Sequence, residues 1–114
     1  MQHYELIHTE QYKGFDVSFY ATHEHMHPRD SFDESCWDVD ELCSKIDNGD
    51  YVWFIAKVTA SKNGIELASE YLGGCLYDNE MQFVKDNDYY NDMRQTVTNE
   101  AKKAIELLAN EVTA

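Results

Sequence analysis

The chain has 114 residues, the usual size of one domain, and its hydrophobic content of 43% is close to the average of globular proteins. Nine Lys and Arg residues stand against 22 Asp and Glu residues, which leaves a net charge of −13 and a sequence pI near 4.5. A charge of this sign repels nucleic acids and anionic membranes, and it attracts basic protein surfaces or cations. We therefore expect one acidic folded domain over residues 1–114, with no direct nucleic-acid or membrane partner.

The cysteines and the first residues indicate the compartment. Cys36, Cys43 and Cys75 are odd in number and form no C-x-x-C pair, so neither a disulfide framework nor a cysteine-based zinc site is expected. The first five residues lack the basic start and apolar run of a signal peptide, and no apolar stretch approaches the roughly 20 residues of a membrane span. These features predict a cytoplasmic protein.

The first two segments, residues 3–12 and 15–25, flank the turn pair Lys13-Gly14 and predict a β-hairpin. A two-residue turn places Tyr12 opposite Phe15 and, in an unbroken register, Tyr4 opposite His23. The face that this register turns to the core carries Tyr4, Leu6, Phe15, Val17 and Phe19.

A helix is predicted between Asp38 and Asn48. Asp38 and Glu41 form a capping-box pattern, and Asn48-Gly49 supplies a left-handed stop. The apolar stripe at helical spacing consists of Val39, Leu42, Cys43 and Ile46.

The second half repeats this order. Residues 51–58 and 65–77 flank Asn63-Gly64 and predict a second hairpin, with a bulge at Gly73-Gly74. After a short helical turn over residues 80–85, a long amphipathic helix carries Tyr90, Met93, Val97, Ala101, Ile105, Leu108 and Val112 on one stripe. The predicted fold is α+β, a four-stranded antiparallel sheet in β-β-α-β-β-α order with both helices on one face.

A run of three histidines is the most distinctive local pattern. His23, His25 and His27 project from one side of an extended strand, a spacing that can hold Zn²⁺, Ni²⁺ or Fe²⁺. The other interpretation is a solvated strand end, because no second ligand cluster is visible. A metal-binding domain is therefore kept as an alternative, and no cofactor is predicted.

No catalytic constellation is expected. Cys43 lies on the apolar stripe of the first helix, and the acidic neighbours of Cys36 raise the pKa expected of its thiol. Carboxylates are too abundant for any pair to indicate a hydrolase, and no phosphate-binding glycine loop is present. We expect a protein that is not an enzyme.

Acidic residues and tyrosines gather in two blocks that flank the second hairpin. Tyrosines combined with carboxylates favour docking on a basic protein surface, because the rings supply contact area and the carboxylates pair with arginine. In the other interpretation the tyrosines pack at the edge of the core and the acidic residues lie on solvated helix and loop faces. The residues expected to bind a partner are Asp33, Glu34, Asp38, Asp40, Glu41, Asp47, Asp50, Asp86, Asp88, Asp92, Tyr89 and Tyr90.

In size, charge and compact α+β organisation the chain resembles the small acidic inhibitors of phages and mobile elements that imitate DNA, the anti-restriction and anti-CRISPR proteins. The resemblance implies a partner that is a basic, nucleic-acid-binding protein, with carboxylates taking the place of phosphates. A further alternative is a homo-oligomeric domain, such as a homodimer, whose second sheet face around Trp53, Ile55 and Tyr20 is covered by another copy.

Overall fold

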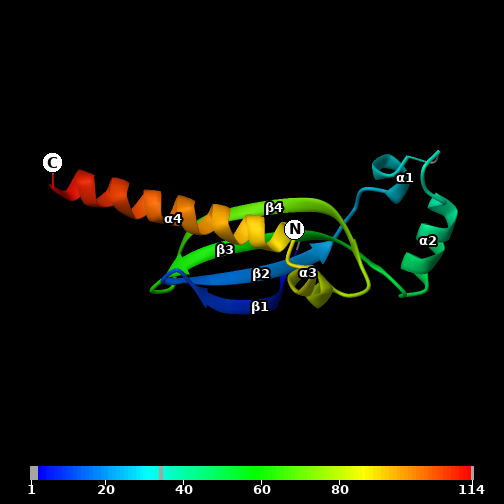
Figure 1. The fold of residues 1–114 in the computed structure, drawn as a ribbon, viewed down its shortest axis with the longest axis horizontal. Helices are drawn as coiled ribbons and strands as arrows, with labels where there is room; N and C mark the ends of the chain where they lie inside the picture. The colour runs from blue at the N-terminus through cyan, green and yellow to red at the C-terminus, as the bar shows by residue number, and fades with distance from the viewer. Residues whose placement is uncertain (1–2, 34, 114) are drawn as a thin grey trace.

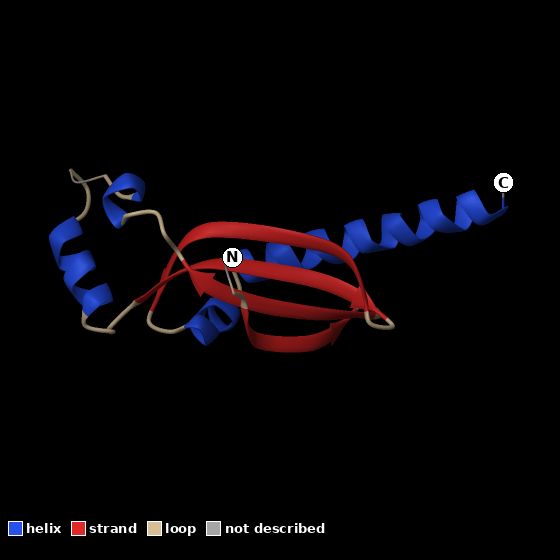
Figure 2. Cartoon of the chain, turned by 180° about the vertical axis from the view of Figure 1, so that it is seen from behind, coloured by secondary structure: helices blue, strands red, loops and turns tan. Residues whose placement is uncertain are grey.

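The computed structural model describes residues 3–33 and 35–113, with only the backbone for residues 110–113. The elements are β1 (Glu5–Tyr12), β2 (Phe15–His23), α1 (Pro28–Ser31), α2 (Val39–Asp47), β3 (Val52–Lys62), β4 (Ile65–Tyr77), α3 (Glu80–Asp86) and α4 (Tyr89–Thr113) (Figure 1). The strands form one antiparallel sheet of order β1-β2-β3-β4, and α3 and α4 pack against it (Figure 2). The predicted α+β fold is confirmed.

Both hairpin turns follow from their sequences. Lys13 and Gly14 have φ values of 52° and 85°, and Asn63 and Gly64 have 54° and 79°. Positive φ at both central residues defines the turn whose twist matches that of the flanking strands, and glycine and asparagine adopt it at low cost. The two turns therefore set where the first strand of each hairpin ends and where its second strand begins.

The core lies between the sheet and α4. Alternate residues of β2 and β3 face it, including Val17, Phe19 and Val58, which are fully buried. Phe83 of α3 stacks on Phe19 with ring centroids 5.0 Å apart, and α4 adds its stripe from Tyr90 to Ala101. The predicted helical stripe thus covers the sheet as far as Ala101.

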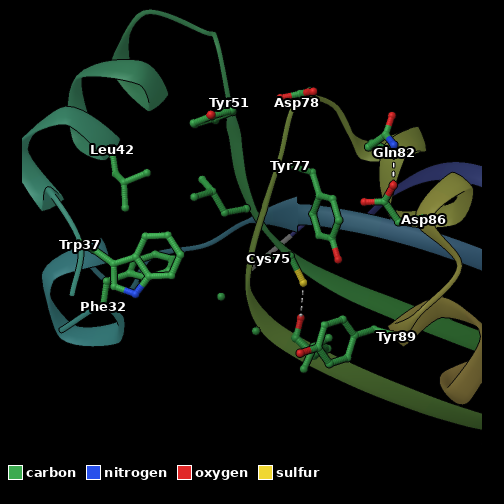
Figure 3. A pocket seen from close by; sticks show the side chains of 14 residues that line it. Phe32, Trp37, Leu42, Tyr51, Cys75, Tyr77, Asp78, Gln82, Asp86 and Tyr89 are labelled. Carbon is green, nitrogen blue, oxygen red and sulfur yellow. Dashed lines mark hydrogen bonds between the residues drawn. The ribbon is translucent and has the colours of Figure 1, made fainter.

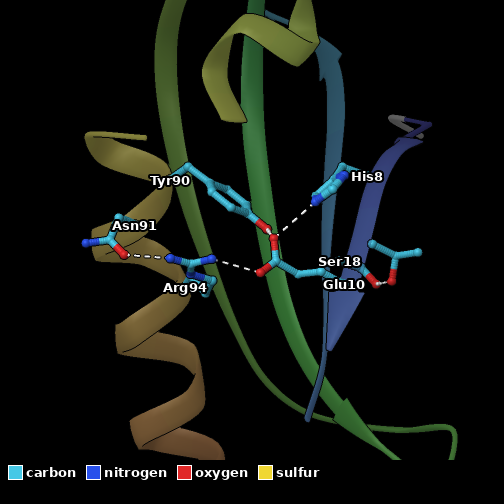
Figure 4. A network of polar contacts seen from close by, with 7 residues as sticks. His8, Glu10, Ser18, Tyr90, Asn91 and Arg94 are labelled. Atoms are coloured by element: carbon cyan, nitrogen blue, oxygen red, sulfur yellow. Dashed lines mark hydrogen bonds and ion pairs between the residues drawn. The ribbon is translucent and has the colours of Figure 1, made fainter. Parts of the chain in front are cut away.

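A polar network also joins α4 to the edge strand β1 (Figure 4). Glu10 accepts hydrogen bonds from the Tyr90 hydroxyl and from Arg94, both at 2.8 Å, and His8 Nε2 lies 3.0 Å from the same carboxylate. Burial raises the pKa of Glu10, but the bonds from Tyr90, Arg94 and His8 lower it more, so the net pKa lies below its ordinary value. The ionised carboxylate holds the helix to the strand.

The register of the first hairpin differs from the prediction near its open end. Tyr12 pairs with Phe15 and His8 with Phe19 as expected, but a bulge at Ile7 then pairs Leu6 with Tyr20. The bulge turns Ile7 towards the core and leaves Leu6 54% exposed, so the prediction of a core-facing Leu6 was wrong. One extra residue in a strand reverses the side of every residue beyond it.

The first long helix also lies elsewhere than expected. α2 begins and ends as predicted, with Asp38 accepting a hydrogen bond from the Glu41 backbone N–H and Gly49 at φ 83°. It packs with α1 beyond the end of the sheet, while α3 and α4 cover the sheet face (Figure 1). The expectation that α2 shares that face was therefore wrong.

The second face of the sheet is partly covered by its own side chains. The ammonium group of Lys57 lies 5.5, 5.8 and 5.7 Å from the ring centroids of Tyr4, Tyr20 and Tyr71. Such cation–π contacts stabilise a lysine above an aromatic surface. Of the three residues predicted for an open second face, Tyr20 belongs to this group, whereas Trp53 is buried against Phe32.

Candidate partner-binding cleft

A cleft of about 670 Å³ separates the sheet from the segment that contains α1 and α2 (Figure 3). We call this segment, residues 28–33 and 35–51, the arm. The cleft is lined by Phe32, Trp37, Leu42 and Tyr51 of the arm, by residues 72–77 of β4, and by Asp78, Gln82, Asp86 and Tyr89. Among the described residues that line it, two are acidic and none is basic.

The arm wall is built from aromatic rings that stack towards the sheet. The Phe32 ring packs edge-on against Trp37, with centroids 5.6 Å apart, and lies tilted against Trp53 of β3, with centroids 5.7 Å apart. The Trp53 indole N–H donates a 2.7 Å hydrogen bond to the Met26 carbonyl oxygen. Trp53 is buried, whereas Trp37 is 54% exposed, so Trp37 presents an aromatic ring at the mouth of the cleft.

A buried carboxylate fixes the base of the arm to β4. Glu24 is only 8% exposed and accepts hydrogen bonds from the backbone N–H groups of Gly74, at 2.8 Å, and Met26, at 3.1 Å. A Cβ on Gly73 would lie 3.0 Å from the same carboxylate, and Gly74 has φ +66°. The glycine pair therefore lets the strand bulge and approach the arm closely, as the sequence predicted for these two positions.

The opposite wall is formed by Tyr77 and Tyr89, with Gln82 donating a hydrogen bond to Asp86 (Figure 3). Burial, together with the nearby Cys75 and Asp86, raises the pKa of Tyr77 to about 12. Its phenol is therefore neutral at physiological pH and can donate a hydrogen bond. Tyr89 is 58% exposed and, like Trp37, offers an open aromatic surface.

Cys75 provides no nucleophile in this cleft. The residue is buried, and its Sγ donates to the Leu72 carbonyl oxygen at 3.3 Å. Burial raises the pKa of the thiol to about 11, which keeps it protonated at neutral pH. Cys75 is therefore a packing residue of the core beneath the cleft.

The floor of the cleft is the edge of the sheet. β4 is the last strand in the order β1-β2-β3-β4, and six consecutive residues, 72–77, line the cleft. Within the described chain no further strand pairs with the outer side of β4. An edge strand presents backbone N–H and C=O groups that an extended segment of another chain can pair with.

Two of the predicted partner-binding residues, Asp86 and Tyr89, line this cleft. Asp88 and Asp92 are exposed nearby, at the start of α4. Tyr90 was predicted to face a partner, and this was wrong: it is 1% exposed and bonded to Glu10 in the core. Neighbouring positions on a helix point about 100° apart, so Tyr89 and Tyr90 cannot share one environment.

On the arm, several predicted acidic residues have local partners. Asp33 accepts bonds from the backbone N–H and hydroxyl of Ser35, which lower the pKa of its carboxyl. Asp38 caps α2, Asp40 pairs with Arg29, and Glu41 lies 3.4 Å from Lys45.

The rest of the arm block is open to solvent or not described. Asp47 and Asp50 are exposed near the end of α2. Glu34 lies outside the described residues.

The three histidines do not converge on one point. His23 and His25 pack edge-on with centroids 5.5 Å apart, but His27 caps α1, where its Nδ1 accepts from the Arg29 backbone N–H at 3.1 Å. No group of three or more His, Cys, Asp or Glu residues in the described part of the chain is placed to hold a metal ion.

The aromatic residues of the arm wall were missed as site residues. The spacing of Trp37 and Leu42 around Asp38 also fits a hydrophobic staple at the start of α2, which is a purely local explanation for both residues. The available signal was the presence of two large aromatic residues in a short loop between helices, which is unusual for a segment exposed to water.

No protein-family model matches the chain, and no significant match was found among curated proteins or solved structures. Within the described residues, no helix combines the length and apolar character that a membrane crossing requires.

Proposed function

We propose that the chain is a non-enzymatic acidic binding protein that occupies the basic, nucleic-acid-binding surface of another protein. The observation that carries this proposal is the lining of the cleft, which combines open aromatic rings with two carboxylates and contains no basic residue among those described. The proposed role matches that of phage and mobile-element inhibitors which imitate DNA.

The chemistry of the cleft favours arginine and lysine side chains. The carboxylates of Asp78 and Asp86 can pair with a guanidinium group, and the rings of Trp37 and Tyr89 can contact its face. Aromatic residues supply most of the contact energy in such interfaces, while charges steer the encounter and select the partner. The net charge of −13 adds long-range attraction for a basic surface.

The edge of β4 indicates the shape of the bound segment. A chain that pairs with the edge of residues 72–77, apart from the Gly74 N–H that is bonded to Glu24, lies extended between the arm and α3, and its alternate side chains point towards the two walls. Gly73 places no side chain in the path of that segment. We therefore favour an extended basic loop or tail of a nucleic-acid-binding protein as the ligand.

The test is recovery of partners from a host lysate with matched variants. Combined Trp37→Ala and Tyr89→Ala substitutions should weaken retention of a basic, nucleic-acid-binding partner by about tenfold or more, since each removes an aromatic anchor. Asp78→Asn with Asp86→Asn should weaken it further at low salt. The control pair is Asp16→Asn with Glu100→Gln, which changes the net charge equally but lies outside the cleft. Equal losses with both acidic pairs would contradict a cleft-based site and leave only a general charge effect.

A further inference from the structure

The C-terminal half of α4 projects past the end of the sheet (Figures 1 and 2). The apolar stripe that covers the sheet is fully buried as far as Ala101 and continues at helical spacing as Ile105 and Leu108, which are 37% and 56% exposed. Leu107, which widens the stripe, is 65% exposed. Three large aliphatic residues on one projecting helix are an uncovered apolar surface.

The same part of the chain is free of the acidic excess. Residues 101–114 contain two lysines and two glutamates, so the whole net charge of −13 lies in residues 1–100. Two copies of this protein repel each other strongly through most of their surface. The projecting half of α4 is where they can approach with the least repulsion.

A groove of about 460 Å³ lies at the base of the projection, between α4 and the two hairpin turns. Phe15 and Ile105 contribute apolar surface, and three of the nine basic residues of the chain, Lys13, Lys62 and Lys102, stand around it. Within the described residues none of these lysines forms an ion pair with a carboxylate. Glu106 is the one acidic residue among its described lining, so the groove combines apolar surface with an excess of positive charge.

We infer that two copies of the chain form a homodimer in which the projecting part of α4 of each copy lies against the groove of the other. A two-fold axis brings Ile105 and Leu108 of both copies together and directs Glu106 of each copy towards Lys62 of its partner. The apolar helix and the basic groove are adjacent in one chain, so the surface is self-complementary, as a two-fold interface requires. An interface with an unrelated protein would not require the helix and the groove of this chain to complement each other.

The dimer leaves the partner-binding cleft free. The arm lies at the opposite end of the 58 Å long molecule (Figure 1). Dimerisation and partner binding can thus be tested separately.

Sedimentation equilibrium of the full chain over a wide concentration range tests this inference. We expect the average mass to rise with concentration from 13.3 kDa towards twice that value. Leu108→Asp should raise the dissociation constant by about tenfold or more, because it places a charge in an apolar contact. Lys62→Glu should weaken the dimer, and adding Glu106→Lys to it should restore association by reversing both charges.

Leu6→Asp is the matched control, since Leu6 is similarly exposed but lies on the open face of the sheet. Circular dichroism confirms that each variant is folded. A monomer at the highest concentration would overturn the inference. So would a dimer that Leu6→Asp dissociates and Leu108→Asp does not, because that result assigns the interface to the sheet.

Discussion

Replacing Glu10 with glutamine tests the polar network that joins α4 to β1 (Figure 4). The substitution keeps the shape of the side chain and removes its charge. In the folded protein this carboxylate accepts bonds from Tyr90 and Arg94 at 2.8 Å, and the side chains of Glu10 and Arg94 are only 25% and 18% exposed. Hydrogen bonds to charged groups contribute about 1.5–3 kcal/mol when largely buried. We expect Glu10→Gln to lower the free energy of unfolding by about 2–3 kcal/mol at pH 7.

The effect should depend on pH in a defined direction. The pKa of Glu10 is lower in the folded protein than its ordinary value of 4.5, so the ionised form stabilises the fold. This stabilisation is complete above the unfolded pKa and is lost as the pH falls through the folded pKa. The difference between wild type and Glu10→Gln should therefore be constant around neutral pH and shrink below about pH 4.5.

Urea denaturation followed by circular dichroism measures both effects. With a denaturant slope of roughly 1–3 kcal/mol/M, the midpoint should fall by about 1–2 M at pH 7. Tyr90→Phe removes one donor to the same carboxylate and should cost less, about 1–2 kcal/mol. Glu100→Gln, an exposed glutamate of the same helix, should change stability by less than about 0.5 kcal/mol. A decrease in the free energy of unfolding below about 0.5 kcal/mol for Glu10→Gln, or a decrease that grows as the pH falls, would show that the ionised Glu10 carboxylate does not stabilise the fold.

Two further predictions concern the cleft floor. Gly74→Ala should lower the free energy of unfolding by at least about 1 kcal/mol, because φ at this position is +66° and a Cβ would lie 3.4 Å from the Trp53 ring. Thermal unfolding measures the change, and unchanged stability would show that the bulge is not constrained. In the native protein a thiol-alkylating reagent should modify the exposed Cys36 readily. It should modify Cys75 very slowly, because that thiol is buried and its pKa is raised to about 11. Mass spectrometry of the labelled peptides measures both rates, and equal rates would contradict the buried position of Cys75.

The parts of the fold that were predicted correctly depend on local chemistry. The turns at Gly14 and Gly64 need left-handed backbone, and Asp38 caps a helix through an N–H three residues away. Neither feature depends on distant parts of the chain. The type and order of the four strands and of α2, α3 and α4 could therefore be predicted from the sequence, whereas the short helix α1 was not predicted.

The errors arose where tertiary contacts decide the outcome. The bulge at Ile7 has no turn residue to mark it, and it is stabilised by packing of Ile7 against the core. Periodicity predicts that α2 buries one face, but does not say which surface covers that face. Tyr90 belongs to the apolar stripe of α4, and its acidic neighbours were given too much weight as a sign of exposure.

The cleft itself could not be predicted from local sequence. It requires Trp37 of the arm, residues 72–77 of β4 and Tyr89 of α4 to meet, and these lie far apart along the chain. The contacts that bring them together include the bond from the Gly74 N–H to Glu24, which joins residues 50 positions apart. Of the acidic residues that were predicted to bind a partner and that the structure describes, only Asp86 lines the cleft directly.

The most direct test of the central claim is a competition between the chain and duplex DNA for a basic partner recovered from the host. If the chain occupies the nucleic-acid-binding surface, we expect the two ligands to exclude each other. A short duplex should displace the chain, and added chain should displace the duplex. Both complexes should weaken as salt is raised. Trp37→Ala with Tyr89→Ala should make the chain a poorer competitor. A stable ternary complex of chain, partner and duplex would contradict occupation of the nucleic-acid-binding surface.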